Sequence, residues 1–149
     1  MSFLLYFLLW TLLLYLMHRL VHKYNIPYVK GWHNDHHKQV IDDKIVGWCW
    51  NNLFLFNDTW KSTFDLWFTE VIPTILFCII TQQWWLLVAY YLWAAFIQEI
   101  IEHNRNFDWY PFLTSGKWHL KHHNCSKCNY GIFFPIWDII FGTAIKESK

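Results

Sequence analysis

The stretch HRLVHKYNIPYVKGWHNDHH, residues 18–37, decides how this chain folds, because it holds five of the nine histidines. The other four histidines lie at position 103 and in HLKHH, residues 119–123. Imidazole is the usual nitrogen ligand for iron, zinc and copper. Histidines gathered in these few places indicate a metal site, and the fold must bring residues 18–37 and 103–123 together.

The spacing within each group predicts helices that carry the ligands. His18 and His22 are four residues apart, which places both on one helical face. The triplets at 33–37 and 119–123 repeat one pattern, i, i+3 and i+4, so each helix presents its triplet on one side. The predicted metal ligands are His18, His22, His33, His36, His37, His103, His119, His122 and His123.

The composition is typical of a membrane protein. Hydrophobic residues make up 55% of the chain, aromatic residues 22% and charged residues only 15%. Residues 1–17 and 71–98 carry no charged side chain, and each run is long enough to enter a bilayer. The first run has no basic region and no small-residue cleavage site, so we expect an anchor helix over 1–17 rather than a cleaved signal peptide.

The charge distribution predicts the topology. The 12 Lys and Arg residues are absent before Arg19 and between Lys61 and Arg105, which favours residues 19–61 and 105–149 on the cytoplasmic side. A single crossing by residues 71–98 would separate the first five histidines from the last four. We therefore predict a hydrophobic hairpin over 64–101 that turns at residues 81–83; the sequence leaves full crossing and re-entry open.

These patterns predict an all-α integral membrane protein with about three hydrophobic helices and a cytoplasmic metal-binding helical bundle built from histidine boxes, for which the resemblance described below implies two metal ions. Residues 1–149 form one domain in this prediction, with the anchor at 1–17, His boxes at 18–37, the hairpin at 64–101 and C-terminal boxes at 103–143. A net charge of +1, without a separate basic patch, argues against nucleic-acid binding.

Cysteine offers a competing metal site. Cys125 and Cys128 have the spacing of zinc ligands and follow His123 closely. A structural zinc site there would leave most of the histidines unexplained, and a haem would need just two axial ligands. A non-catalytic zinc or haem protein, or an accessory protein without activity, remains the alternative to an enzyme.

The order of the boxes resembles the fatty acid hydroxylase superfamily, which includes sterol desaturases, sterol methyl oxidases and sphingolipid hydroxylases. The resemblance covers about residues 18–143, and its C-terminal part is the most specific. The matching segments are His18–His22, His33–His37, Gln98–Asn104, His119–His123, Asn129–Gly131, Trp137–Asp138 and Phe141–Thr143.

The resemblance implies a membrane-bound oxygenase with two non-haem iron ions, or zinc found in their place, on the cytoplasmic face. It implies dioxygen as a substrate and electrons from NAD(P)H through a reductase and a cytochrome b-type carrier. The oxidised partner would be a lipid such as a fatty acyl chain, a sphingolipid or a sterol, hydroxylated or desaturated at a C–H position. A second copy of the chain is a further expected partner. The membrane would be the endoplasmic reticulum in a eukaryote or the inner membrane in a bacterium.

Carboxylates near the ligands are expected to balance the charge of two metal ions held by neutral imidazoles. The candidates are Asp35, Glu99, Glu102 and Asp138, with Asn104 and Tyr130 as further supporting residues. Glu99 stands four residues before His103, where some superfamily members carry a histidine, so it is expected either to bind metal or to orient that imidazole. Simple turn or capping roles for Asp138 and for residues 129–131 remain open.

Overall fold

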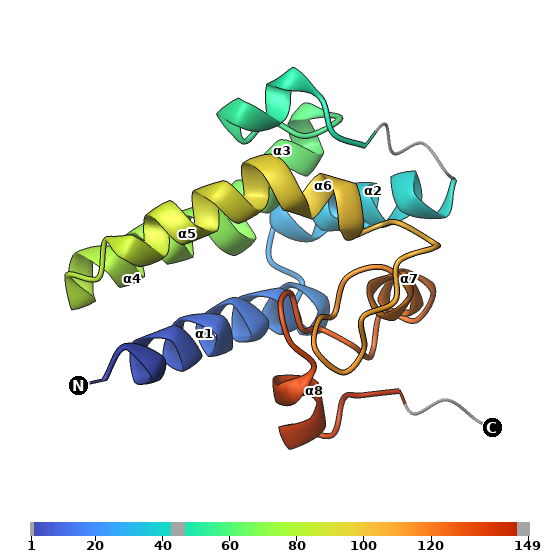
Figure 1. Ribbon diagram of the computed structural model, residues 1–149. Coiled ribbons are helices and arrows are strands. Elements are labelled where there is room, and N and C mark those ends of the chain that lie inside the picture. Colours follow the sequence, from blue (N-terminus) through green and yellow to red (C-terminus); the bar gives the residue numbers. More distant parts are fainter. Residues whose placement is uncertain (1, 43–46, 146–149) are drawn as a thin grey trace.

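The regular structure is helical throughout the described part of the chain, residues 2–42 and 47–145 of the computed structural model (Figure 1). The predicted all-α class is confirmed. The helices are α1 (Phe3–Lys23), α2 (Val29–Ile41), the 3-10 helix η1 (Trp50–Phe54), α3 (Trp60–Leu66), the π-helix η2 (Trp67–Val71), α4 (Ile72–Thr81), α5 (Trp85–Trp93), the π-helix η3 (Ala94–Gln98), α6 (Glu99–Ile101), α7 (Lys117–Asn124) and α8 (Ile136–Ile140).

Helix α1 joins the predicted anchor to the first histidine pair. It runs unbroken through His18 and His22 and ends at Lys23, before the Ile26–Pro27 pair. A proline disfavours helical geometry in the residue before it, so the chain turns here and restarts as α2. The side chains of Trp10, Leu14 and the first histidine are buried, while the opposite face of α1 is largely exposed.

Two helical rods and a short turn occupy the region in which the hairpin was predicted, with the turn at residues 82–84 against the expected 81–83. Residues Trp60–Thr81 form one continuous rod of α3, η2 and α4, and Trp85–Ile101 form the returning rod of α5, η3 and α6. Gln82, at φ 58°, ends the first rod in the left-handed region.

By length and composition, two of the described helices are sufficient to cross a membrane: Phe3–Lys23 and Trp60–Thr81. The second has 22 residues, or about 33 Å of helix, which matches the thickness of a bilayer core. The returning helix, Trp85–Ile101, is apolar but shorter. The helix of the first arm runs back through residues 64–70 and begins at Trp60, four residues before the predicted start of the hairpin.

The hydrophobic core lies between α1 and the hairpin. Trp10 packs against Tyr90 and Phe133, and its indole nitrogen donates a 2.9 Å hydrogen bond to Thr74 Oγ1. A buried indole N–H needs a partner, so this bond fixes α1 against α4. A second bond, from Trp137 Nε1 to Thr11 Oγ1 at 3.1 Å, attaches α8 to the same helix.

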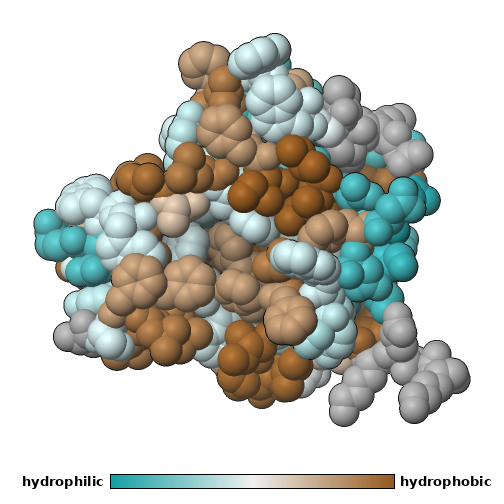
Figure 2. All heavy atoms as spheres, viewed as in Figure 1, coloured by the Kyte–Doolittle hydropathy of each residue, from teal (hydrophilic) through white to brown (hydrophobic). Residues whose placement is uncertain are grey.

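The two ends of the molecule differ in polarity. The start of α1 and the turn between α4 and α5 lie at one end, and α2 and α7 lie at the other (Figure 1). Hydrophobic residues cover much of the visible face between these ends; the larger hydrophilic group lies on the side of α2 and α7, and a smaller one lies at the end with the turn between α4 and α5 (Figure 2). Lys44, Lys146 and Lys149, which contributed to the predicted topology, lie outside the described residues.

Gly116 fixes the start of α7, which carries the last histidine triplet. Its backbone N–H donates to the Glu102 carbonyl at 2.8 Å, and the next N–H, that of Lys117, donates to the Phe107 carbonyl at 3.0 Å. Gly116 has a φ of +72°, and a Cβ at this position would lie 2.1 Å from the Phe107 carbonyl oxygen. Only glycine permits this close approach.

We expect Gly116→Ala to destabilise the protein by more than about 2 kcal/mol, because a methyl group cannot share space with backbone oxygen. The measurement is the fraction of detergent-purified protein that stays monodisperse after a temperature series. Gly31→Ala is the matched control, since Gly31 lies in α2 and a Cβ added there would meet nothing within 4 Å. Its expected effect is a gain of up to about 1 kcal/mol from helix propensity. If the two variants lost monodispersity at the same temperature, the predicted clash between the added methyl group and the Phe107 carbonyl would be refuted.

Candidate metal centre

The nine histidines form two adjacent groups, and within each group the ligand atoms lie within 4.8 Å of one another. Helix α2 contributes to both groups: His33 and His37 belong to one group, and His36 belongs to the other. The five-histidine group consists of His18, His22, His33, His37 and His122. The four-histidine group consists of His36, His103, His119 and His123.

In the five-histidine group the Nε2 atoms converge on one point. His22 Nε2 lies 2.9 Å from His122 Nε2 and 2.7 Å from His33 Nε2, and His33 Nε2 lies 3.1 Å from His37 Nε2. A neutral imidazole has one N–H and one lone pair, so a ring of mutually facing Nε2 atoms cannot all be satisfied by hydrogen bonds. A cation bound by the lone pairs satisfies them, and this donor set fits a transition metal.

The outer nitrogens of this group are held by the surrounding protein. His18 Nδ1 bonds the Tyr130 carbonyl at 2.9 Å, and His122 Nδ1 bonds the Cys128 carbonyl at 2.7 Å. His33 Nδ1 bonds Asp65 Oδ2 at 2.8 Å. When Nδ1 carries the proton toward these acceptors, the lone pair of Nε2 faces inward, as a metal ligand requires.

The four-histidine group contains ring nitrogens without a protein partner. His119 Nε2 and His123 Nε2 face each other at 2.8 Å. Both nitrogens of His103, and Nδ1 of His123, are buried and make no hydrogen bond within the described structure. Buried polar atoms are normally satisfied, so unpartnered imidazoles aimed into one pocket also fit a metal ion.

Burial keeps these imidazoles in the form that binds metal. It lowers the pKa of His37 to about 4 and that of His103 to about 3. The pKa values of His36, His119 and His123 are also lowered by burial and by the neighbouring rings. The side chains are therefore neutral near pH 7, and a metal ion does not compete with protons for them.

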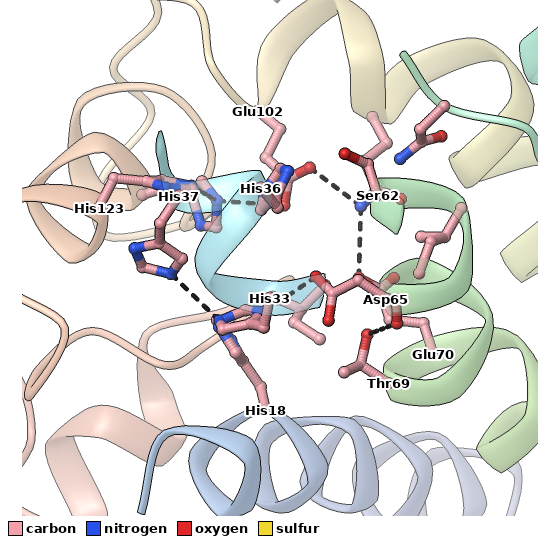
Figure 3. A pocket seen from close by; sticks show the side chains of 15 residues that line it. His18, His33, His36, His37, Ser62, Asp65, Thr69, Glu70, Glu102 and His123 are labelled. Carbon is pink, nitrogen blue, oxygen red and sulfur yellow. Dashed lines mark hydrogen bonds and ion pairs between the residues drawn. The ribbon is translucent and has the colours of Figure 1, made fainter. Parts of the chain in front are cut away.

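Carboxylates from the hairpin line the other side of the pocket, as Figure 3 shows for Asp65 and Glu70 beside His33. Gln98 Nε2 donates to Glu70 Oε1 at 3.4 Å and to Glu102 Oε2 at 2.9 Å. The two π-helices supply this contact, since Glu70 lies in η2 and Gln98 in η3. Single π-helical turns occur frequently at functional sites.

Asp65 and Glu70 were absent from the residues predicted from sequence. Both positions fall inside the predicted hairpin of residues 64–101, but the carboxylates considered as supporting residues were ones close in sequence to a histidine or to a matching segment. A signal was available: both lie in a helix that is otherwise apolar enough to span a bilayer. An ionisable side chain in such a helix is expected to serve a function.

Asp138 holds the C-terminal loop against the five-histidine group. Its carboxylate accepts hydrogen bonds from the backbone N–H groups of Tyr130 and Gly131, at 2.8 and 2.9 Å, and from Thr143 Oγ1 at 2.7 Å. This fixes the Tyr130 carbonyl that bonds His18. The Tyr130 ring also packs edge-on against His18 and His122.

Three of the proposed supporting residues belong neither to the two histidine groups nor to the lining of the pocket in the described structure. Asp35 pairs with Lys61 at 3.4 Å, and exposed Asn104 bonds the Ile100 carbonyl in its own turn. Glu99 contributes to neither histidine group and does not line the pocket. Glu102 instead approaches the ligands, with Oε1 3.6 Å from His119 Nε2.

The cysteine pair does not join either group of ligand atoms in the described residues. Cys128 Sγ donates to the Cys125 carbonyl at 2.9 Å within a tight turn. Burial raises the pKa of the Cys128 thiol to about 12, so it stays protonated near neutral pH. A thiol in this form is a poor zinc ligand.

We expect Asp65→Asn to lower metal affinity about 10-fold to 100-fold, because the charge behind His33 is removed. Metal retained per chain during titration with a chelator measures the effect. Asp35→Asn is the control, since it removes a carboxylate of the same bundle that pairs with Lys61 instead. Equal metal loss from the two variants would show that general charge, and not the contact with His33, sets the affinity.

Comparison with known proteins identifies the family to which this chain is similar. The family model described as fatty acid hydroxylase matches residues 3–143, which include every histidine and the Asp138 loop. Comparisons with curated proteins and with solved structures give no match. The match covers nearly the whole chain, and both histidine groups fall inside it. The resemblance noted in the sequence is thus confirmed, and the chain belongs to the fatty acid hydroxylase family.

Proposed function

We propose that this protein is a membrane-bound diiron oxygenase that hydroxylates or desaturates a C–H position of a lipid in lipid biosynthesis. Family membership implies an oxidoreductase of the hydroxylase or desaturase type. The observation that supports the proposal most strongly is the pair of adjacent all-histidine groups at the polar end of apolar helices. One metal ion in each group accounts for all nine imidazoles.

The two groups are close enough to act as one centre. His37 of the five-histidine group lies beside His123 of the four-histidine group, with ring centroids 4.3 Å apart. Iron bound here would activate dioxygen with electrons delivered from NAD(P)H through a reductase and a cytochrome b-type carrier. In hydroxylation one oxygen atom of dioxygen is inserted into the C–H bond. The other oxygen atom takes up two electrons and two protons and is released as water.

The protein residues hold and shield this centre. Tyr130, Cys128 and Asp65 orient imidazoles through Nδ1, so the ligand set is arranged before metal binds. Leu66 and Ile132 are among the residues that line the pocket at the centre. Apolar side chains beside a reactive site limit the access of water to it.

An apolar groove supports a lipid as the substrate. It has a volume of about 490 Å³ and is lined by Leu13 and Met17 of α1 and by Phe68, Ile72 and Leu76 of the hairpin, with further apolar residues. The groove and the metal pocket are lined by consecutive residues of the same helices, Met17 and His18 in α1 and Phe68 and Thr69 in η2. From Phe68 it follows the helix to Ile80, roughly 18 Å, and suits an extended hydrocarbon chain.

We further propose that the histidine end faces the cytoplasm. The described Lys and Arg residues belong to the end of α1, to α2, to the start of α3 and to residues 105–127, all connected with the histidine end. The endoplasmic reticulum or a bacterial inner membrane would then be the location. An electron-transfer protein would dock at this face, and a second copy of the chain remains a proposed partner.

We expect about two iron ions per chain in protein purified in mild detergent. His37→Ala and His122→Ala should lose metal and abolish the activity while membrane insertion is unchanged, because each removes a ligand of the five-histidine group. Elemental analysis measures the metal, and lipid profiling of expressing cells measures a hydroxylated or desaturated product.

The outcomes separate the alternatives. Metal without any new lipid product would favour a non-catalytic metal-binding or accessory protein, and a single zinc would favour the Cys125–Cys128 site. Unchanged metal content in both alanine variants would refute the metal centre.

We expect Leu13→Trp to lower the amount of lipid product at least several-fold, because the larger side chain fills the groove between α1 and α4. Metal content should stay at the wild-type level. Leu16→Trp is the matched control, since Leu16 lies on the same helix, is exposed and does not line the groove. Product levels that are equal in the two variants would place the lipid elsewhere.

A further inference from the structure

Glu102 is a buried carboxylate that lies beside the four-histidine group. It follows α6 directly and is buried, with 7% of its surface exposed, next to His103. Its Oε1 lies 3.6 Å from His119 Nε2, the same nitrogen that faces His123 Nε2 at 2.8 Å. An oxygen this close to a converging ligand nitrogen lies beside the position of the metal ion itself.

Oε2 of Glu102 accepts a hydrogen bond from the protein, and this bond orients Oε1. Gln98, one helical turn earlier, donates its side-chain N–H to Glu102 Oε2 at 2.9 Å. The same amide nitrogen lies 3.4 Å from Glu70 Oε1, so the amide is held from two sides. Oε1 is left to face the four-histidine group, in the arrangement of a carboxylate that binds metal through one oxygen and is hydrogen-bonded through the other.

The number of ligands in each group and the charge of Glu102 also favour a contact between this carboxylate and a metal ion. One group offers five imidazoles, whereas the other offers four. A buried carboxylate is strongly destabilising unless a cation compensates it. His119 is neutral when it acts as a ligand, so it provides no such charge, and a metal ion bound by the four histidines does.

We infer that Glu102 is a ligand of the metal ion in the four-histidine group, which makes the two metal sites chemically unequal. One site has five imidazoles, and the other has four imidazoles and a carboxylate. The inference rests on the proposed dimetal centre but not on the identity of the lipid. It differs from the sequence-based expectation, in which Glu99 was the carboxylate of the third box that could bind metal.

The test compares Glu102→Gln with Glu99→Gln, two carboxylates of one short segment: Glu102 Oε1 lies 3.6 Å from His119 Nε2, whereas Glu99 belongs to neither histidine group and does not line the pocket. Detergent-purified protein is loaded with ⁵⁷Fe(II) without oxygen, and iron per chain is measured during titration with a chelator. We expect Glu102→Gln to release one of two iron ions at a chelator concentration at least 10-fold lower than the wild type. One of two Mössbauer doublets should change and the other should persist. Glu99→Gln should match the wild type in both measurements.

Several results would overturn the assignment. Glu102→Gln with wild-type affinity and an unchanged spectrum would remove Glu102 from the ligand set, and selective iron loss from Glu99→Gln would transfer the role to Glu99. If Glu102→Gln fails to fold, Glu102→Asp gives the answer, since a shorter ligand should shift one doublet and an unshifted pair would refute the contact. A wild-type chain without bound metal would refute the metal centre as well, and so is distinguishable from failure of this assignment alone.

Discussion

The structure depends on the convergence of nine imidazoles at one end of a bundle of apolar helices. Nitrogen atoms that face each other at about 3 Å in a buried pocket are stable only when a cation or a set of hydrogen bonds satisfies them. Helix α2 makes the convergence possible, because its triplet faces two ways. Two of its histidines enter one group and one enters the other, so α1, α7 and the end of the hairpin must all pack around it.

The hairpin contributes charge compensation that the histidine boxes lack. Its two π-helical segments lie opposite each other and join Glu70 to Gln98, while Asp65 holds His33. Acidic groups inside an apolar helix are expensive unless they serve a partner. The bundle places them against the proposed metal centre, and this explains why such residues are compatible with a helix that is apolar enough to span a membrane.

The sequence predicted much of this arrangement from a few residues. The i, i+4 spacing of His18 and His22, the repeated triplets and the uncharged runs gave the helices, the hairpin and the turn at Gln82. Asp65 and Glu70 were missed because neither lies close in sequence to a histidine, and only the packing of α3 against α2 brings Asp65 to His33. Glu99 and Glu102 could not be separated from spacing alone, since α6 ends at Ile101 and the helical i, i+4 relation expected between Glu99 and His103 does not hold.

By itself, then, the sequence determined the type of ligand, the helical elements that carry the ligands and the apolar segments that surround them, because each of these is a local property of residue type and period. Only the tertiary structure decided how nine histidines divide into a group of five and a group of four. It also decided that Tyr130, Cys128 and Asp65 hold the outer nitrogens, and that Glu102 faces the pocket. These contacts join residues as far as 112 positions apart, and no local pattern encodes the angle at which two helices meet.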